Sequence, residues 1–183
     1  EHHWDFDGVA SLLVNYRPSG RFEAGYQYTS YSEHGEYNIK YWDRKMKDFV
    51  WQDNLHAPFF YRRQIHSFYA MLTDRMGKVE FDAGLRADHT IDELTISVAG
   101  ADRYIRRLEL FPSAHVSYDA GRGSVFTLGY SYRTNRPGIW QLEPYITYED
   151  YYTKQIGNPD IRPEYIHTVE VGYRKSFAQE NSV

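Results

Sequence analysis

The sequence contains no cysteine among its 183 residues, which excludes a disulfide framework, thiolate chemistry and a cysteine-based metal site. It also lacks any run of about 18 apolar residues, so a transmembrane helix is excluded. The formal net charge of -4 provides no basic excess, and we expect no nucleic-acid partner. Residues 1–4 do not begin a basic region followed by an apolar one, so we expect no secretory leader within this chain.

Catalytic motifs are equally scarce. None of the eight histidines stands at a zinc-ligand spacing such as His-Glu-x-x-His. The chain carries neither a Gly-x-Ser-x-Gly nucleophile motif nor a phosphate-binding loop. We therefore expect a protein that is not an enzyme and that holds no metal and no cofactor.

Aromatic residues, in contrast, are abundant. Eighteen Tyr, ten Phe and four Trp make up 17% of the chain. Tyr and Trp favour strands, and they gather at membrane interfaces, where the ring lies in the apolar layer and its polar edge meets water. Composition alone fits a membrane β-protein and a tyrosine-rich soluble β-protein equally well.

Apolar and polar residues alternate along several segments. From Val79 to Ala87 every second residue is apolar, and charged residues or glycine occupy the positions between. The stretches Phe22–Tyr28, Phe126–Tyr132 and Val169–Tyr173 repeat this pattern. A period of two predicts strands with one apolar and one polar face. We predict main strands at 8–17, 21–33, 61–73, 78–90, 107–119, 124–136 and 166–177, with further strand-like sequence at 36–51 and 94–99.

The predicted connections alternate between short and long. Tight turns at 17–20, 74–77 and 119–123 contain the Gly or Pro that such turns use, whereas long connections cover 34–60, 91–106 and 137–165. Every second connection falls at the same end of the sheet, so one rim has only short turns and the other has only long loops. Membrane barrels have this asymmetry. The predicted fold is therefore all-β, an antiparallel up-and-down meander that forms a segment of a larger transmembrane β-barrel.

The predicted polar face carries many charges. A dry core would require a partner for each of them, whereas a water-filled lumen accommodates them at little cost. The same alternation also fits a soluble sandwich, because periodicity does not distinguish inside from outside. The charged positions are Glu80, Asp82, Arg86, Asp88, Glu170 and Arg174.

The last quarter of the chain holds a distinctive combination of motifs. Residues 131–144 read Ser-Tyr-Arg-Thr-Asn-Arg-Pro-Gly-Ile-Trp-Gln-Leu-Glu-Pro, residues 156–165 read Ile-Gly-Asn-Pro-Asp-Ile-Arg-Pro-Glu-Tyr, and residues 169–173 read Val-Glu-Val-Gly-Tyr. This combination resembles the C-terminal β-barrel region of TonB-dependent outer-membrane receptors, in particular the outer-membrane β-barrel family common in Bacteroidetes. Ile161 stands where that family usually has Leu, and Arg162 where it often has Lys.

The resemblance implies a place and a role. It implies that residues 1–183 form a single β-barrel segment in the outer membrane of a Gram-negative cell, without the plug domain and the remaining strands. Seven strands agree with a segment, because bacterial barrels have an even number and at least eight. The implied partners are outer-membrane lipid, a scarce nutrient (a metal chelate, cobalamin or a glycan), and the TonB complex through the missing plug alone.

The long connection 137–165 and the Arg before it form the candidate ligand site. Interleaved rings and hydrogen-bonding groups suit a sugar-like or siderophore-like ligand, because rings stack on apolar faces while polar groups fix orientation. The same rings also suit packing within the loop and at the membrane rim. The candidate ligand residues are Arg136, Trp140, Tyr145, Tyr148, Tyr151 and Tyr152.

A second group of residues is predicted to be structural. Each Pro fixes its own φ and pushes the preceding residue towards an extended conformation, so this stretch predicts a rigid lead-in to strand 166–177. Asn158 or Asp160 is expected to bond a nearby backbone N–H. The structural residues are Asn158, Pro159, Pro163, Glu164 and Gly172.

Two other interpretations remain open from sequence. The first alternative is a soluble antiparallel β-barrel or sandwich that binds a small ligand through its aromatic loops and manages both sheet edges itself. The second is an outer-membrane enzyme barrel, which the missing nucleophile motif disfavours. If the chain is a barrel segment, its open edges and apolar face predict that it self-associates in water.

Overall fold

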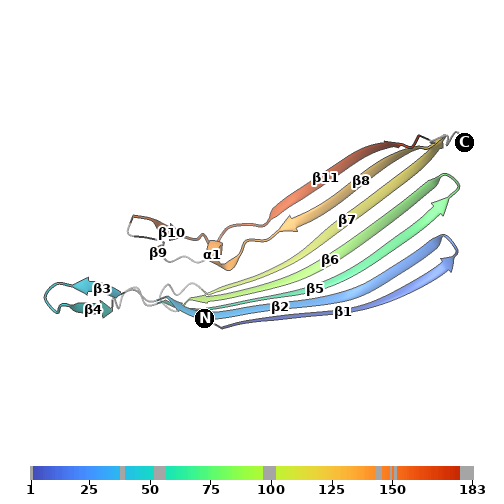
Figure 1. Cartoon of the computed structure of the whole chain (residues 1–183). Coiled ribbons are helices and arrows are strands. Elements are labelled where there is room, and N and C mark those ends of the chain that lie inside the picture. Colours follow the sequence, from blue (N-terminus) through green and yellow to red (C-terminus); the bar gives the residue numbers. More distant parts are fainter. Residues whose placement is uncertain are drawn as a thin grey trace, which may run out of the picture.

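Seven long strands form one antiparallel sheet in the computed structural model, which describes residues 2–37, 40–51, 57–96, 102–142, 146–148, 150 and 152–177 (Figure 1). Their order across the sheet is β1-β2-β5-β6-β7-β8-β11, a meander in which neighbours in sequence are neighbours in space. The predicted all-β meander is therefore confirmed. The strands are β1 (His2–Arg17), β2 (Gly20–Tyr37), β5 (Ala57–Met76), β6 (Val79–Ile96), β7 (Arg103–Gly121), β8 (Ser124–Asn135) and β11 (Glu164–Lys175).

Four short strands and one helical turn lie in the long connections. The strand-like sequence at 36–51 forms a separate hairpin of β3 (Lys40–Asp43) and β4 (Asp48–Trp51). The connection after β8 contains α1 (Ile139–Leu142), β9 (Ile146–Tyr148) and β10 (Lys154–Ile156). In the part of the chain that the structure describes, no helix is long and apolar enough to cross a bilayer.

Most strands extend further towards the long connections than their periodicity predicted. Strand β5 begins at Ala57 rather than at 61, and β6 continues to Ile96 rather than ending at 90. The strand predicted at 94–99 is the end of β6, and residues 97–99 lie outside the described residues. The alternation weakens in these extensions because inward-facing positions there hold apolar residues such as Tyr61 and Leu94.

The turn between β1 and β2 is fastened to the end of β5. Arg17 Nε donates to Asp74 Oδ1 at 3.0 Å, and the Tyr16 hydroxyl donates to Asp74 Oδ2 at 2.5 Å. Ser19 Oγ donates to Asp74 Oδ1 at 3.2 Å, and the Asp74 side chain is buried. Gly20 is required for this arrangement, because a Cβ there would stand 2.5 Å from Tyr16 Cζ and 2.6 Å from Arg17 Cγ.

One face of the sheet is an apolar band. Directly paired residues of neighbouring strands point to the same face, and on β6 this face carries Val79, Phe81, Ala83, Leu85, Ala87 and His89. Ten residue steps from Val79 to His89 span about 34 Å along the strand, or about 26 Å along the membrane normal at the tilt of about 40° that barrels adopt. The lipid-facing band of outer-membrane barrels is about 25 Å tall. We call this the outer face.

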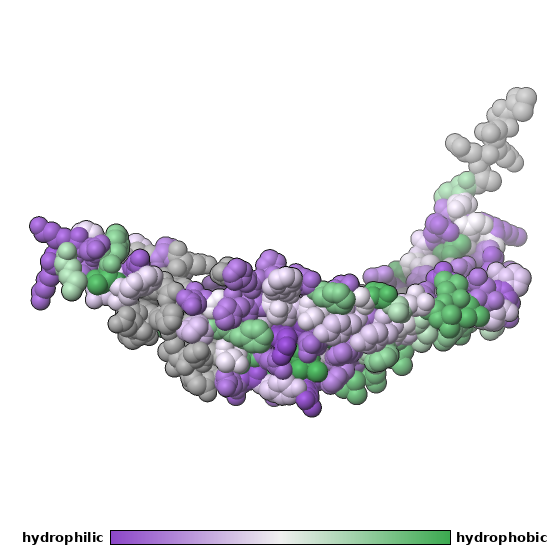
Figure 2. Space-filling view, turned by 90° about the horizontal axis from the view of Figure 1, so that it is seen from below, coloured by the Kyte–Doolittle hydropathy of each residue, from purple (hydrophilic) through white to green (hydrophobic). Residues whose placement is uncertain are grey.

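Aromatic rings border the band at both ends. Towards the turns, Phe126 and Tyr173 pair with ring centroids 4.9 Å apart. Towards the long connections, Tyr28 and His66 lie 4.9 Å apart, and His89 follows His66 at 6.2 Å. Figure 2 shows hydrophobic side chains gathering towards the turn end of the molecule, while polar ones dominate towards the connections.

The opposite face, which we call the inner face, is polar along most of its length. It carries the charged positions expected to face a wet lumen, among them Asp82, Arg86 and Asp88. An apolar cluster lies at the end with the long connections, where Phe59, Tyr61 and Leu94 are buried.

Candidate functional site

The connection between β8 and β11 folds back over the inner face. We call residues 137–163 the inward segment. Leu142 of α1 is 7% exposed and joins the buried cluster of Phe59, Tyr61 and Leu94, against which Ile139 and Ile161 also pack. Helix α1 and Ile161 of the segment thus lie on the inner side of the wall at the rim with the long connections.

A gap in the sheet allows this fold-back. Strands β7 and β8 pair only between Ser113–Gly121 and Ser124–Ser131, so the remaining half of β7 has no partner on that side. Beyond this point β8 and β11 diverge from β7 (Figure 1). The polypeptide turns inward directly after β8, where Pro137 is buried and cannot continue a strand ladder.

Backbone hydrogen bonds give the inward segment a fixed shape. The Asn158 N–H donates to the Gln141 carbonyl at 2.6 Å, joining the two ends of the segment. The Asp160 N–H donates to Asn158 Oδ1 at 2.9 Å. Pro163 is buried, and a turn at residues 159–160 precedes the irregular residues that lead into β11.

Arg136 anchors the start of the inward segment. Its Nη2 donates to Asp88 Oδ2 at 3.1 Å and to Glu109 Oε2 at 2.8 Å. The Asp88 and Glu109 side chains are only 4% and 7% exposed, so both charges depend on partners within the protein. Arg86 Nε donates to Asp88 at 2.7 Å, and the Tyr165 hydroxyl of β11 donates to Glu109 at 2.7 Å.

A second carboxylate, Asp92, anchors Pro137, the residue after Arg136, through Arg63. Asp92 accepts from Arg63 Nε at 2.6 Å and from Arg107 Nη1 at 3.4 Å. Arg63 Nη1 also donates to the Pro137 carbonyl at 3.2 Å, which links this group to the inward segment. These seven charged side chains form the arginine–carboxylate network: Arg63, Arg86, Arg107, Arg136, Asp88, Asp92 and Glu109.

The arginine–carboxylate network carries an excess of one positive charge, four guanidiniums against three carboxylates. Its hydrogen-bonding capacity is also incompletely used. Arg136 Nε and Thr90 Oγ1 are buried without a hydrogen-bond partner among the described residues, and Thr90 is only 1% exposed. A wall of this kind favours polar or anionic groups in the space beside it.

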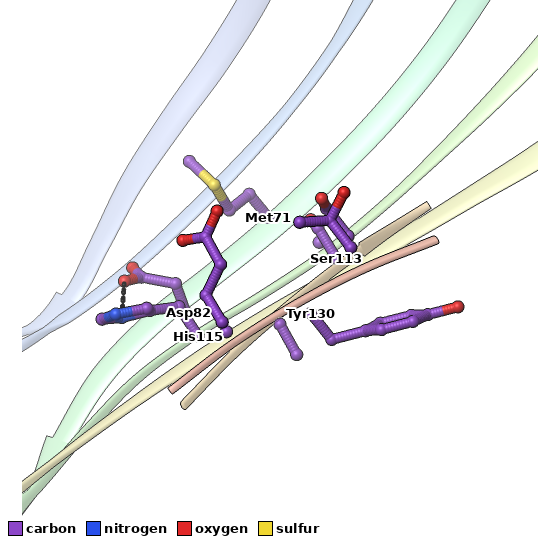
Figure 3. Close-up of a pocket in the computed structure, with 11 residues that line it drawn as sticks. Met71, Asp82, Ser113, His115 and Tyr130 are labelled. Atoms are coloured by element: carbon purple, nitrogen blue, oxygen red, sulfur yellow. Dashed lines mark ion pairs between the residues drawn. The ribbon is translucent and has the colours of Figure 1, made fainter. Parts of the chain in front are cut away.

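Two neighbouring hollows lie lower on the inner face, with volumes of about 210 and 420 Å³. Both are lined by Met71, Gly84 and Ser113, and a Cβ on Gly84 would stand 2.7 Å from Ser113 Oγ. In the smaller hollow His115 Nδ1 lies 4.0 Å from Asp82 Oδ2 (Figure 3). In the described ranges, no group of three or more His, Asp and Glu could hold a metal ion.

The structure separates the predicted ligand residues into two kinds. Trp140 and Tyr152 are 59% and 91% exposed on the inward segment, so their rings are open to solvent. Arg136 is committed to Asp88 and Glu109. Tyr145, Tyr151 and the side chain of Tyr148 lie outside what the structure describes.

Asp150 forms a local turn in the same segment. It accepts from the backbone N–H of Tyr152 at 2.7 Å, and from the hydroxyl and N–H of Thr153 at 3.0 and 2.7 Å. These bonds, first of all that from the Tyr152 N–H, lower the pKa of the Asp150 carboxyl below its usual value. The carboxylate therefore holds the loop backbone in place.

The residues predicted to be structural lie at the entry to β11 and within it. Pro159 lines the small space between the inward segment and β5–β7. Glu164 accepts from Asn135 Nδ2 at 3.2 Å across the first pair of the β8–β11 ladder. Gly172 lies opposite Thr127, and its missing side chain leaves room for the Thr127 hydroxyl.

Sequence reasoning missed five members of this site. Tyr61, Arg63, Asp92, Arg107 and Glu109 received no role, although Asp88 and Arg86 were placed on the polar face. A signal was available, since Asp88 and Asp92 on one strand and Arg107 and Glu109 on the next continue the polar alternation towards the long connections. Their partners on the inward segment could not be read from sequence, because that segment has no periodicity.

A model of the outer membrane protein β-barrel family matches residues 13–182, nearly the whole chain. The chain belongs to this family. A search of the curated proteins found no match. Membership in the outer membrane protein β-barrel family identifies the apolar outer face as the membrane-facing wall, and the chain resides in the cell outer membrane. This location disagrees with the soluble alternative considered from sequence.

Proposed function

We propose that the chain forms the barrel wall and the outer loops of a TonB-dependent receptor that takes up a scarce nutrient, either a metal chelate, cobalamin or a glycan. The observation that carries the proposal is the inward segment. Its helical turn packs on the inner wall at the rim with the long connections, next to the arginine–carboxylate network, and the segment carries two exposed rings, Trp140 and Tyr152. Stacking rings with nearby charges can select a small polar ligand before it passes further.

The remaining parts of this proposal follow from the wall itself. The chain supplies a surface for outer-membrane lipid on one side and a polar lumen on the other. The TonB complex would act through a plug domain, which is not among the elements described. The protein acts by binding and passage, not as an enzyme.

Uptake measurements test this function directly. In cells that depend on the intact protein, we expect a protonophore to stop nutrient uptake, because TonB-dependent transport draws on the inner-membrane proton gradient. Trp140→Ala with Tyr152→Ala should weaken ligand binding while the protein remains in the outer membrane. Uptake that continues after the gradient collapses would contradict the proposal.

A passive channel is the second candidate, and one observation favours it. The arginine–carboxylate network sets cationic and anionic groups side by side on the inner face near the rim with the long connections, an arrangement that filters ions by charge in open pores. Steady ionic conductance of the intact protein in a planar bilayer would support this candidate over the receptor.

A further inference from the structure

The outer face changes character at the upper border of the apolar band on β5, β6 and β7. Leu110 and Leu108 of β7 are 55% and 74% exposed, and the next two outward positions are Arg106 and Tyr104. The step from Leu108 to Arg106 rises about 5 Å along the membrane normal, given about 3.4 Å per residue and a tilt of about 40°. Arg106 therefore stands directly above the acyl-chain layer, at headgroup height.

Arg106 is a cation without a carboxylate. Its Nε and Nη2 donate to the Tyr104 hydroxyl at 2.9 and 2.6 Å, and its guanidinium lies 4.8 Å from the centroid of the Tyr104 ring. Among the residues that the structure describes, it makes no ion pair. Nearby Arg62 differs, because its Nη2 lies 2.6 Å from Glu93 Oε2 and the carboxylate neutralises its charge. Tyr104 thus orients a guanidinium that makes no ion pair of its own, while Glu93, directly opposite Tyr104, is bonded to Arg62.

Hydrogen-bonding rings lie below and beside this cation. His89 lies directly opposite Leu108 on the neighbouring strand, diagonal to Arg106 at a separation of about 7–8 Å. His66 continues the row towards β2, where its Nδ1 is bonded to the Tyr26 hydroxyl at 2.7 Å. We call Arg106, Tyr104, His89 and Leu108 the basic outer patch.

We propose that the basic outer patch binds a phosphate group of an outer-leaflet glycolipid. Arg106 pairs with the phosphate, His89 provides a hydrogen bond from below, and the acyl chains lie over Leu108 and Leu110. An anionic lipid provides a charge for Arg106 and acyl chains for Leu108 and Leu110. A free anion lacks the acyl chains, and an uncharged lipid lacks the charge. The proposal rests on the outer-membrane location and not on the identity of the nutrient.

Native mass spectrometry of the intact outer-membrane protein in a zwitterionic detergent tests the proposal, with lipid A as the probe. We expect lipid A to bind in preference to phosphatidylethanolamine. Arg106→Gln should weaken lipid A binding about fivefold, because a basic residue near an anionic surface contributes about 1 kcal/mol. Arg106→Lys should keep most of the affinity. Arg75→Gln, on the inner face at the opposite rim, is the control and should bind as the wild type does.

Two results would overturn the proposal. The first is equal lipid A binding by the wild type and Arg106→Gln. The second is displacement of lipid A by inorganic phosphate at equal concentration, which would mean an adventitious ion only. If Arg106→Gln loses its β-sheet circular dichroism, Tyr104→Phe provides a second variant. Tyr104→Phe keeps the charge of Arg106 but removes the hydroxyl that orients its guanidinium. This variant should bind lipid A more weakly than the wild type.

Discussion

At the scale of single residues, Arg136 joins Asp88 of β6 and Glu109 of β7 to the start of the inward segment. Replacing it by Gln leaves Asp88 and Glu109 buried with one partner fewer. Removing one partner of a buried pair usually costs about 3–5 kcal/mol, and we expect about 3 kcal/mol here because Arg86 and Tyr165 remain bonded. Denaturant unfolding of the vesicle-inserted protein measures this loss.

Arg133→Gln is the control for that experiment. Arg133 is an exposed arginine of β8, three residues before Arg136, and it makes no ion pair in the described ranges. We expect a change within about 0.5 kcal/mol. Adding Glu109→Gln to Arg136→Gln should restore part of the lost stability, since it removes the charge left unpaired. Equal losses from the two arginine variants would contradict the role assigned to Arg136.

Gly20 is the second residue whose role is specific. Gly20→Ala would drive a methyl group into the Tyr16 ring and the Arg17 stem, displacing both from Asp74. Overpacking of this kind costs about 1–3 kcal/mol. Gly8→Ala is the matched change, because its Cβ meets only the Phe6 ring at 3.3 Å. Unfolding free energies of the pair should differ by more than about 1 kcal/mol, and a smaller difference would show that the Asp74 contacts tolerate displacement.

At the scale of elements, the inward segment should detach when its apolar contact is removed. Leu142 and Trp140 lie on the same helical turn, one buried and one exposed. Leu142→Ala deletes a buried side chain, a change that typically costs about 2–5 kcal/mol. Limited proteolysis should therefore cut residues 143–157 faster in Leu142→Ala, and not in Trp140→Ala. Faster cleavage in both variants would mean that α1 is not the docking contact.

The elements differ in how far sequence could predict them. The seven strands were predictable because each has an apolar face, which imposes a period of two. The inward segment was not, because Leu142 reaches Tyr61 and Arg136 reaches Asp88 across long stretches of chain. Arg136 was selected for the Arg-Pro motif and assigned to a ligand, whereas the structure shows two intramolecular carboxylates beside it. The exposed Trp140 and Tyr152 keep their predicted role as a proposal.

At the scale of the whole molecule, the sheet is open. Within the described part of the chain, strands β1 and β11 each have a partner on one side only. Free strand edges and a broad apolar face favour association in water. We expect light scattering to show dimers or larger species in plain buffer and smaller particles when detergent covers the outer face. A stable monomer without detergent would contradict this expectation.

The central claim is the orientation of the wall, with one face towards lipid and the other towards the lumen. Leu12 and Leu13 are adjacent on β1 and point to opposite faces. Leu12 pairs with Ala24 on the outer face, and Leu13 pairs with Glu23 on the inner face. The decisive measurement is the folding free energy of Leu12→Arg and Leu13→Arg in lipid vesicles. The account predicts a loss of about 2–4 kcal/mol for Leu12→Arg and less than about 1 kcal/mol for Leu13→Arg. Equal or reversed losses would contradict it.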